Sequence, residues 1–151
     1  MSDSDANDMF EFCRQNTQYY QYCGRQPSLK LVLSDLHITP PGIDPSDKYY
    51  IGFYQKDTLI ALMDLIDGYP EPGTAYIGFF MVNKAYQGQQ LGTAIIRDTT
   101  AYLKAAGKTA VRLGINKGNP QSTHFWKKNG FFVIREVDRD GGTILVAERT
   151  L

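Results

Sequence analysis

The sequence predicts an α/β fold in which a mixed, mainly antiparallel, twisted sheet is flanked by helices. Three consecutive runs rich in Tyr, Ile, Phe and Val, separated by short turns, are typical of an antiparallel meander: Lys48 to Gln55, Thr58 to Asp67 and Ala75 to Val82. A helical segment and another strand follow the meander, and a strand-helix-strand unit brings its two strands parallel. With 151 residues, of which 42% are hydrophobic, the chain is large enough for one core, so we expect a single domain over residues 1–151.

The elements outside the meander follow from helix and turn signals. Asn7 to Tyr22 reads as a first helix ended by Gly24 and Pro27, and Ser28 to Leu36 reads as a second. After the meander we expect a helix from about Gly88 to Gly107, a strand at Thr109 to Ile115, a short helix opened by Asn119, and two strands, Phe131 to Asp138 and Thr143 to Arg149, around the turn RDGG.

The composition favours a small cytoplasmic enzyme or binding domain. Sixteen basic and sixteen acidic residues cancel without a Lys/Arg run, which argues against nucleic acid or an anionic membrane as the main partner. Apolar stretches such as Leu59 to Met63 are too short to span a bilayer, and the opening MSDSDAND does not look like a signal peptide.

Neither the cysteines nor the histidines show metal-ligand spacing. Cys13 and Cys23 lie in a helical segment, where we expect reduced thiols that fill core positions. His37 and His124 stand apart from each other and from both cysteines, and His124 reads as a solvated helix residue. We therefore expect no metal.

The segment from Tyr76 to Thr93, YIGFFMVNKAYQGQQLGT, carries the main functional signal. An apolar strand runs into a turn with Gly88 and Gly92, and that turn opens a helix whose first amides have no intrahelical acceptor. Such amides, together with the positive end of the helix dipole, favour an anion such as a phosphate. The alternative is an ordinary strand-to-helix turn.

A second segment, Asn119 to Phe131, strengthens the functional interpretation. There an Asn opens a short helix, Phe125 and Trp126 follow six and seven residues later, and the helix stops at Gly130 before the next strand. This layout resembles the second cofactor motif of the GCN5-related N-acetyltransferases. The first segment is similar to the pyrophosphate loop of that family, with Gln87 and Gly92 in place and Gln90 where a middle Gly is usual.

The resemblance covers about residues 48 to 150 and implies acetyl-CoA as co-substrate. It implies that backbone amides hold the pyrophosphate and that the sheet splays beside the third meander strand, where main-chain groups of Phe80, Met81 and Val82 meet the pantetheine arm and the acetyl oxygen. It also places Asn119 and Trp126 beside the cofactor, although Asn119 followed by Pro120 is equally a helix N-cap. The amides expected at the pyrophosphate are those of Gly88, Gln89, Gln90, Leu91, Gly92 and Thr93.

The proton-handling residues of the family are not matched. Trp126 stands where many members have a Tyr that acts as the acid, and Gly114 stands where some members have a Glu. The remaining candidates are Asp64 and Asp67, on an apolar strand, and Tyr76 on the neighbouring strand, and of these Asp67, next to Gly68, is expected to start a turn. Asp64 acts on the acceptor amine directly or through water, or else it makes a structural hydrogen bond.

The resemblance implies direct transfer of an acetyl group to a primary amine of a small molecule or peptide. The alternative is a CoA-binding sensor or regulatory module that lacks proton chemistry. Tyr19 and Tyr20 are candidates for lining the acceptor site, with packing on the sheet as the alternative. Family members usually begin with a strand ahead of the first helix, whereas residues 1–8 are too polar to form a good one. Two expectations stay open: the chain starts late, or another segment covers that sheet edge, for example from a second subunit of a homodimer.

Overall fold

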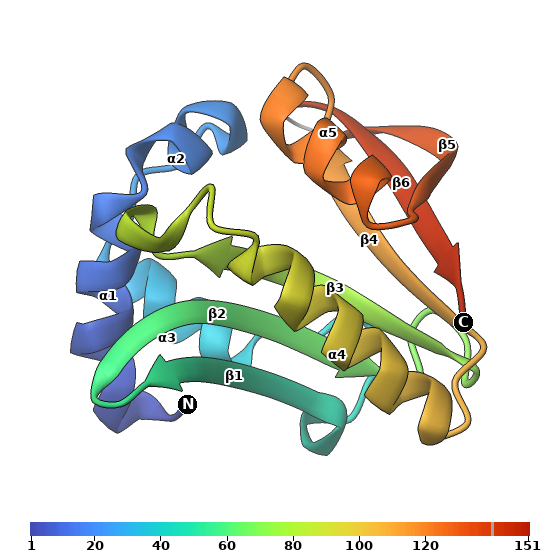
Figure 1. Ribbon diagram of the computed structural model, residues 1–151, viewed down its shortest axis with the longest axis horizontal. Helices are drawn as coiled ribbons and strands as arrows, with labels where there is room; N and C mark the ends of the chain where they lie inside the picture. Colours follow the sequence, from blue (N-terminus) through green and yellow to red (C-terminus); the bar gives the residue numbers. More distant parts are fainter. Residues whose placement is uncertain (140) are drawn as a thin grey trace.

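The structure is a computed structural model that describes residues 1–139 and 141–151, and for Cys23 the backbone alone. Six strands form one sheet in the order β1-β2-β3-β4-β6-β5, with helices on both faces (Figure 1). The elements in chain order are η1 (Asp3–Asp5), α1 (Ala6–Gln15), α2 (Thr17–Cys23), α3 (Leu29–His37), η2 (Pro45–Asp47), β1 (Lys48–Gln55), β2 (Thr58–Asp67), β3 (Thr74–Val82), η3 (Lys84–Tyr86), α4 (Leu91–Ala105), β4 (Ala110–Asn116), α5 (Pro120–Lys128), β5 (Phe132–Arg139) and β6 (Gly142–Thr150).

The sheet confirms the predicted fold class. β3 and β4, joined by α4, are parallel, and all other neighbouring strands are antiparallel. The parallel ladder stops at the pair Ile77 and Leu113, beyond which the two strands diverge (Figure 1). At the same level Asp64 pairs with Phe79 and Leu65 with Ile77, so Gly78 is the extra residue of a β-bulge. The predicted splay of the central strands is therefore present.

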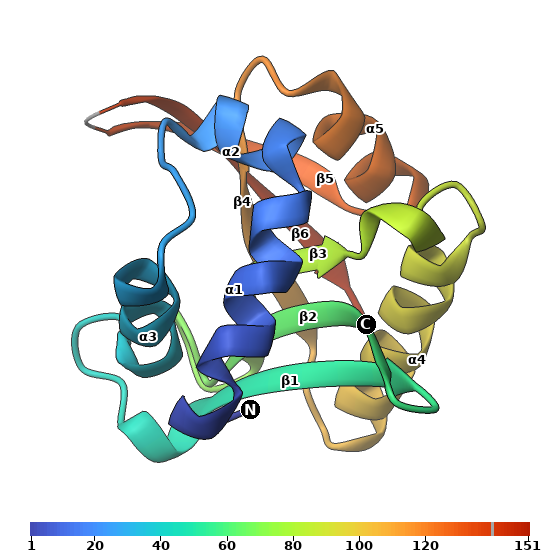
Figure 2. The ribbon, with the colours of Figure 1, turned by 90° about the vertical axis from the view of Figure 1, so that its left-hand side faces the viewer.

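Two hydrophobic cores hold the helices on opposite faces of the sheet (Figure 2). On one face α4 and α5 bury Ile96, Leu103 and Trp126 against the central strands. On the other face α1 and α3 cover β1 to β3, and Met9 is fully buried there. The site described below lies where the central strands of this sheet diverge.

The first predicted helix is in fact two helices, so the expectation of one helix over 7–22 is wrong. Asn16 interrupts it with φ −101° and ψ 53°, and its side-chain Nδ2 donates to the carbonyl of Phe12 at 2.9 Å. A short carboxamide that bonds to the preceding turn competes with the helical hydrogen-bond pattern, which explains the break. α2 then ends at Gly24, which adopts the left-handed conformation.

The helix expected from about Gly88 begins only at Leu91. Gly88 and Gln90 have φ values of 77° and 62°, a left-handed conformation that a right-handed helix cannot contain. At its other end, Gly107 has φ 86° after the cap residue Ala106, as expected for a glycine that terminates a helix.

The outer edge of β1 carries no additional strand within residues 1–139 and 141–151, in agreement with the absence of strand character near the start of the sequence. The amino group of Met1 instead donates to the main-chain carbonyl of Tyr50 at 2.8 Å. Cys13 is buried in the second core, while the prediction for the side chain of Cys23 falls outside the described part of the structure. Within the described residues, every helix is too short or too polar to cross a membrane.

Candidate active site

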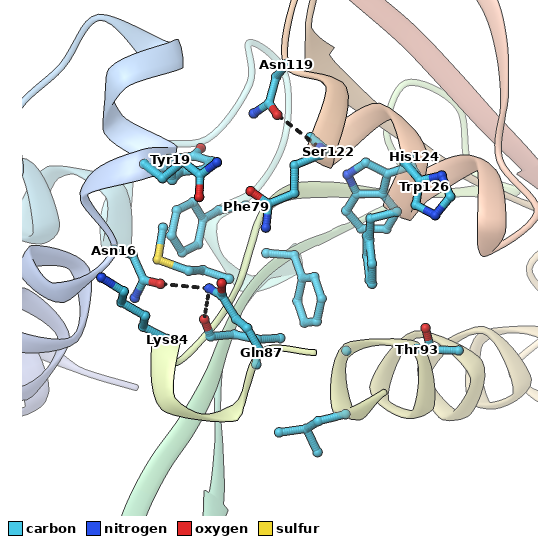
Figure 3. A pocket seen from close by; sticks show the side chains of 18 of the residues that line it. Asn16, Tyr19, Phe79, Lys84, Gln87, Thr93, Asn119, Ser122, His124 and Trp126 are labelled. Carbon is cyan, nitrogen blue, oxygen red and sulfur yellow. Dashed lines mark hydrogen bonds between the residues drawn. The ribbon is translucent and has the colours of Figure 1, made fainter. Parts of the chain in front are cut away.

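A cleft of about 450 Å³ lies where β3 and β4 diverge (Figure 3). Its walls come from both faces of the sheet, namely the junction of α1 and α2 on one side and the start of α4 together with α5 on the other. The residues predicted to bind the cofactor that line it are Phe80, Met81, Val82, Gln87, Gly88, Gln90, Leu91, Gly92, Thr93, Asn119 and Trp126.

The turn before α4 is open on the side of the cleft. A side chain at Gly88 would meet no atom within 4 Å, and Gln90 takes the left-handed conformation although the family usually has Gly at this place. The first helical hydrogen bond runs from the Ala94 N–H to the Gln90 carbonyl at 3.0 Å. The N–H groups of Leu91, Gly92 and Thr93 therefore precede the intrahelical pattern and are available to an anion.

The side chains of two residues in the predicted pyrophosphate loop hydrogen-bond within the protein. Gln89 lies outside the cleft lining and donates its side-chain Nε2 to the Ala85 carbonyl at 3.1 Å. Gln87 lines the cleft, but its Nε2 donates to Asn16 Oδ1 at 3.0 Å and to the Val82 carbonyl at 2.9 Å (Figure 3). Gln87 thus connects the junction of α1 and α2 to the end of β3.

One hydrogen bond shows which main-chain N–H and C=O groups of β3 point toward β2 and which point toward the cleft. Asn83 donates its N–H to the Ile60 carbonyl of the segment paired with β3, at 2.8 Å. Because main-chain groups alternate sides along a strand, those of Met81 also point toward β2, whereas those of Phe80 and Val82 point toward the cleft. The Val82 carbonyl already accepts from Gln87, so Phe80 offers the N–H and C=O nearest the splay.

Asn119 caps α5 and also lines the cleft. Its Oδ1 accepts from the Ser122 N–H at 3.0 Å, as expected of an N-cap, and Pro120 occupies the first turn. The cap uses the side-chain oxygen, which leaves the Nδ2 amide as the group for a ligand. The predicted cap and the predicted cofactor contact are therefore compatible.

Trp126 belongs to an aromatic cluster beneath the cleft. Its ring packs edge-to-face against Phe125 and Phe131, with centroids 5.0 Å apart in both cases, and the side chain is 7% exposed. A side chain at Gly92 would approach Phe125 Cε2 to 3.1 Å and Val82 Cγ2 to 3.2 Å. Gly92 therefore lets the first turn of α4 pack closely against α5 and β3.

Tyr76 reaches the place of the missing family Glu. A side chain at Gly114, which lines the cleft, would lie 3.3 Å from the Tyr76 hydroxyl and 2.9 Å from Ile144 Cγ2. Burial raises the pKa of Tyr76, while the charges of Arg139, Arg135 and Arg112 act in the opposite direction. The phenol is therefore a neutral hydrogen-bond donor, and it lies next to Gly114 although Tyr76 itself does not line the cleft.

Asp64 lies behind the bulge and not in the cleft lining. A side chain at Gly78 would stand 2.7 Å from Asp64 Oδ2, and Gly78 itself lines the cleft. Lys48 Nζ donates to both carboxylate oxygens at 2.8 Å, and the Lys48 and Asp64 side chains are 4% and 12% exposed. Burial raises the pKa of Asp64 and the hydrogen bond from Lys48 opposes that shift.

The two residues predicted to line the site of the acceptor amine, Tyr19 and Tyr20, lie in different parts of the structure. Tyr19 lines the cleft and packs edge-to-face on Phe79, with ring centroids 5.3 Å apart. Tyr20 is buried in the core between the N-terminal helices and the sheet, next to Cys13, and does not line the cleft. Burial is the main cause that raises the pKa of Tyr20.

Several cleft residues were not predicted from the sequence. They are polar or aromatic side chains of the α1 and α2 junction, η3, β4 and α5: Gln15, Asn16, Thr17, Gln18, Lys84, Tyr86, Asn116, Gln121, Ser122, His124 and Lys128. Asn16 and Gln87 are 71 residues apart, so no local pattern indicates their contact. In the part of the chain that the structure describes, no three His, Cys, Asp or Glu side chains are grouped so that they could hold a metal ion.

Solved structures with this fold include several acetyltransferases. An acetyltransferase from Thermus thermophilus has a TM-score of 0.81 and 22% identity, covering 100% of this chain and 94% of that chain. The PaiA N-acetyltransferase from Thermoplasma acidophilum, in complex with coenzyme A, has a TM-score of 0.71 and 19% identity, covering 100% and 96%. The aminoglycoside acetyltransferase AAC(6')-Ib with coenzyme A and kanamycin has a TM-score of 0.76 and 17% identity, covering 99% and 91%.

Sequence comparison identifies the family. No curated protein matches the chain, but the family model described as "Acetyltransferase (GNAT) family" matches residues 8–131, which is most of the 151 residues. That match includes β3, the turn before α4 and the cap of α5, from which the cleft is built. The chain belongs to the GNAT acetyltransferase family.

Proposed function

We propose that the protein transfers the acetyl group of acetyl-CoA to a primary amine of a small molecule or peptide by direct attack. The observation that carries this proposal is the cleft between the diverging strands β3 and β4, which is lined from both faces of the sheet. Helix amides lie on one side and the α1 and α2 junction on the other, so donor and acceptor can approach from opposite faces. The AAC(6')-Ib complex with kanamycin supports a small-molecule acceptor.

The residues at the start of α4 fit a pyrophosphate. The open space at Gly88 and the N–H groups of Leu91, Gly92 and Thr93 provide an anion site. Next to it, the Phe80 main chain faces the cleft and the Asn119 amide is free of the cap, so both can bind the pantetheine arm. Gln90 preserves the turn conformation that the family forms with Gly.

In the proposed reaction the amine attacks the thioester carbon, the C–N bond forms, the C–S bond breaks and the thiolate takes up a proton. The Phe80 N–H is the main-chain donor that polarises the carbonyl. Tyr76 supplies a neutral hydroxyl near Gly114 for the thiolate, in place of the family Tyr that Trp126 replaces. Asp64, directly or through water behind Gly78, is the proposed acceptor of the amine proton.

Ligand binding is the first test. Acetyl-CoA and CoA should raise the melting temperature, because a ligand that binds only the native state stabilises it by ~2.7 kcal/mol at a hundred times its dissociation constant. Adenosine should raise it much less, since the proposed contacts go to pyrophosphate and pantetheine. If millimolar acetyl-CoA leaves the melting temperature unchanged, the proposed site is wrong.

Turnover is the second test and separates an enzyme from a CoA-binding sensor. Release of the CoA thiol from acetyl-CoA should accelerate with at least one amine of a panel of amino acids, peptides, polyamines and aminoglycosides. A protein that binds CoA tightly and shows no amine-dependent thiol release would instead support the regulatory function.

A further inference from the structure

The acceptor side of the cleft is formed by groups that can donate hydrogen bonds. At the junction of α1 and α2, Gln15 and Gln18 contribute carboxamides and Thr17 a hydroxyl, and all three are exposed in the cleft lining. Asn16, between them, is buried and uses its side chain to hold Phe12 and Gln87. The three exposed residues are therefore those that can reorient toward a ligand.

A positive charge lies next to these donors. Lys84, on η3, lines the cleft, and its side chain extends toward Asn16 and the end of α1 (Figure 3). It is exposed, so its ammonium remains free to turn toward a bound group. Ammonium, carboxamide and hydroxyl donors around one space form a site for a carboxylate.

Three arginines outside the cleft lining also act on the acceptor face of the sheet. Arg135 and Arg139, on β5, act with Arg112 on the Tyr76 hydroxyl beside Gly114. The charge of Arg112 is offset by ion pairs with Glu148 and Glu71, whereas Arg135 and Arg139 are exposed. The ammonium of Lys84 in the cleft lining repels a polycation and attracts an anion, and the exposed arginines outside the lining act in the same direction.

We propose that the acceptor is a small amine that carries a carboxylate, as in a free amino acid, and not a polyamine or an aminoglycoside. This inference rests on the proposed function and specifies the substrate class of the same cleft. The carboxylate pairs with Lys84 and the donors of the α1 and α2 junction. The amine then points toward the splay between β3 and β4, where the thioester lies.

The test compares free amino acids with their own carboxamides, spermidine and kanamycin in the thiol-release assay. The best amino acid should have a higher kcat/KM than its carboxamide, spermidine and kanamycin, when amines are compared at equal concentrations of the unprotonated form. Lys84→Glu should lower kcat/KM for that amino acid about tenfold and lower it much less for the carboxamide. The KM for acetyl-CoA should not change by more than about twofold.

The matched control is Lys30→Glu, the same charge change on an exposed residue of α3 outside the cleft lining, and it should leave the ratio of amino acid to carboxamide unchanged. Fastest turnover of spermidine or kanamycin would overturn the inference while supporting the proposed function. A Lys84→Glu defect confined to the KM of acetyl-CoA would also overturn it, by assigning Lys84 to the cofactor phosphates. If no amine causes thiol release, the proposed acetyltransferase activity itself is refuted.

Discussion

At the scale of single residues, the proposed reaction depends on which side chain protonates the CoA thiolate, because Trp126 stands where many family members have a Tyr that acts as the acid. Tyr76 occupies the space next to Gly114, while Trp126 is held among aromatic rings and its indole N–H is a poor acid. We predict that Tyr76→Phe lowers kcat by ~10²-fold or more and that Trp126→Phe lowers it only a few-fold. Steady-state kinetics with the best acceptor will test this, and the reverse order of effects would exclude Tyr76 as the acid.

The ion pair of Lys48 and Asp64 leads to a prediction about stability. Asp64→Asn leaves a buried ammonium without its partner, so it should reduce the free energy of unfolding by about 3–5 kcal/mol. The double variant Lys48→Met/Asp64→Leu removes both charges and should recover most of that loss. Urea denaturation measures both values, and an equally unstable double variant would show that the charges themselves are not the cause.

The same double variant separates structure from catalysis. If Asp64 accepts the amine proton, the double variant should fold and bind acetyl-CoA with normal affinity, yet show a kcat reduced by ~10²- to 10⁴-fold. A stable double variant with normal turnover would assign Asp64 a structural role alone.

Gln90 offers a third test at this scale because it adopts a conformation that favours glycine. The left-handed region costs a non-Gly residue about 1–2 kcal/mol, whereas Gly itself costs roughly 0.5–1 kcal/mol through the greater freedom of the unfolded chain. We predict that Gln90→Gly unfolds at an equal or higher urea concentration, with unchanged CoA affinity. Gln90→Val, which introduces a β-branched side chain there, should unfold at a lower urea concentration than the wild-type protein. Destabilisation by Gln90→Gly would show that the Gln side chain itself stabilises the turn.

At the scale of elements, α5 combines a helix cap with a proposed cofactor contact at Asn119, and two substitutions distinguish these roles. Asn119→Ala should cost about 1 kcal/mol of stability through the lost cap. Asn119→Asp keeps an acceptor for the Ser122 N–H and places a negative charge at a helix N-terminus, so stability should be retained. Acetyl-CoA binding should nevertheless weaken, because the Nδ2 donor is lost. Full affinity in Asn119→Asp, measured by calorimetry, would show that Asn119 is only a cap.

Most elements could be predicted because each has a local physical signal. β1 to β3 are apolar and β-branched or aromatic, and Gly107 and Asn119 mark helix ends. The break at Asn16 was missed because its cause is a side chain that bonds to Phe12 and to the distant Gln87. Likewise, a left-handed Gln90 has no signature in a sequence, since glycine is the residue usually expected there.

At the scale of the whole molecule, the antiparallel meander of β1 to β3 and the parallel pairing of β3 with β4 follow from the chain order of strands and helices, and the splay follows from the family resemblance. The position of β6 between β4 and β5 was not predicted. Which side chains meet at the splay could not be predicted. Tyr76 approaches Gly114 only because β3 and β4 are paired in parallel up to Leu113, and Lys84 extends toward Asn16 only because η3 lies beside the junction of α1 and α2. These contacts depend on register and packing between segments that are distant in sequence.

The cleft lined from both faces of the sheet has a consequence for kinetics. In the proposed arrangement the donor reaches the splay past α4 and the acceptor past the α1 and α2 junction, so neither substrate would have to leave before the other enters. Double-reciprocal plots at several fixed concentrations of the second substrate should therefore intersect, and CoA should inhibit competitively against acetyl-CoA but not against the amine. Parallel lines would mean that an acetylated protein forms between two half-reactions, which the open route between the two faces makes unnecessary.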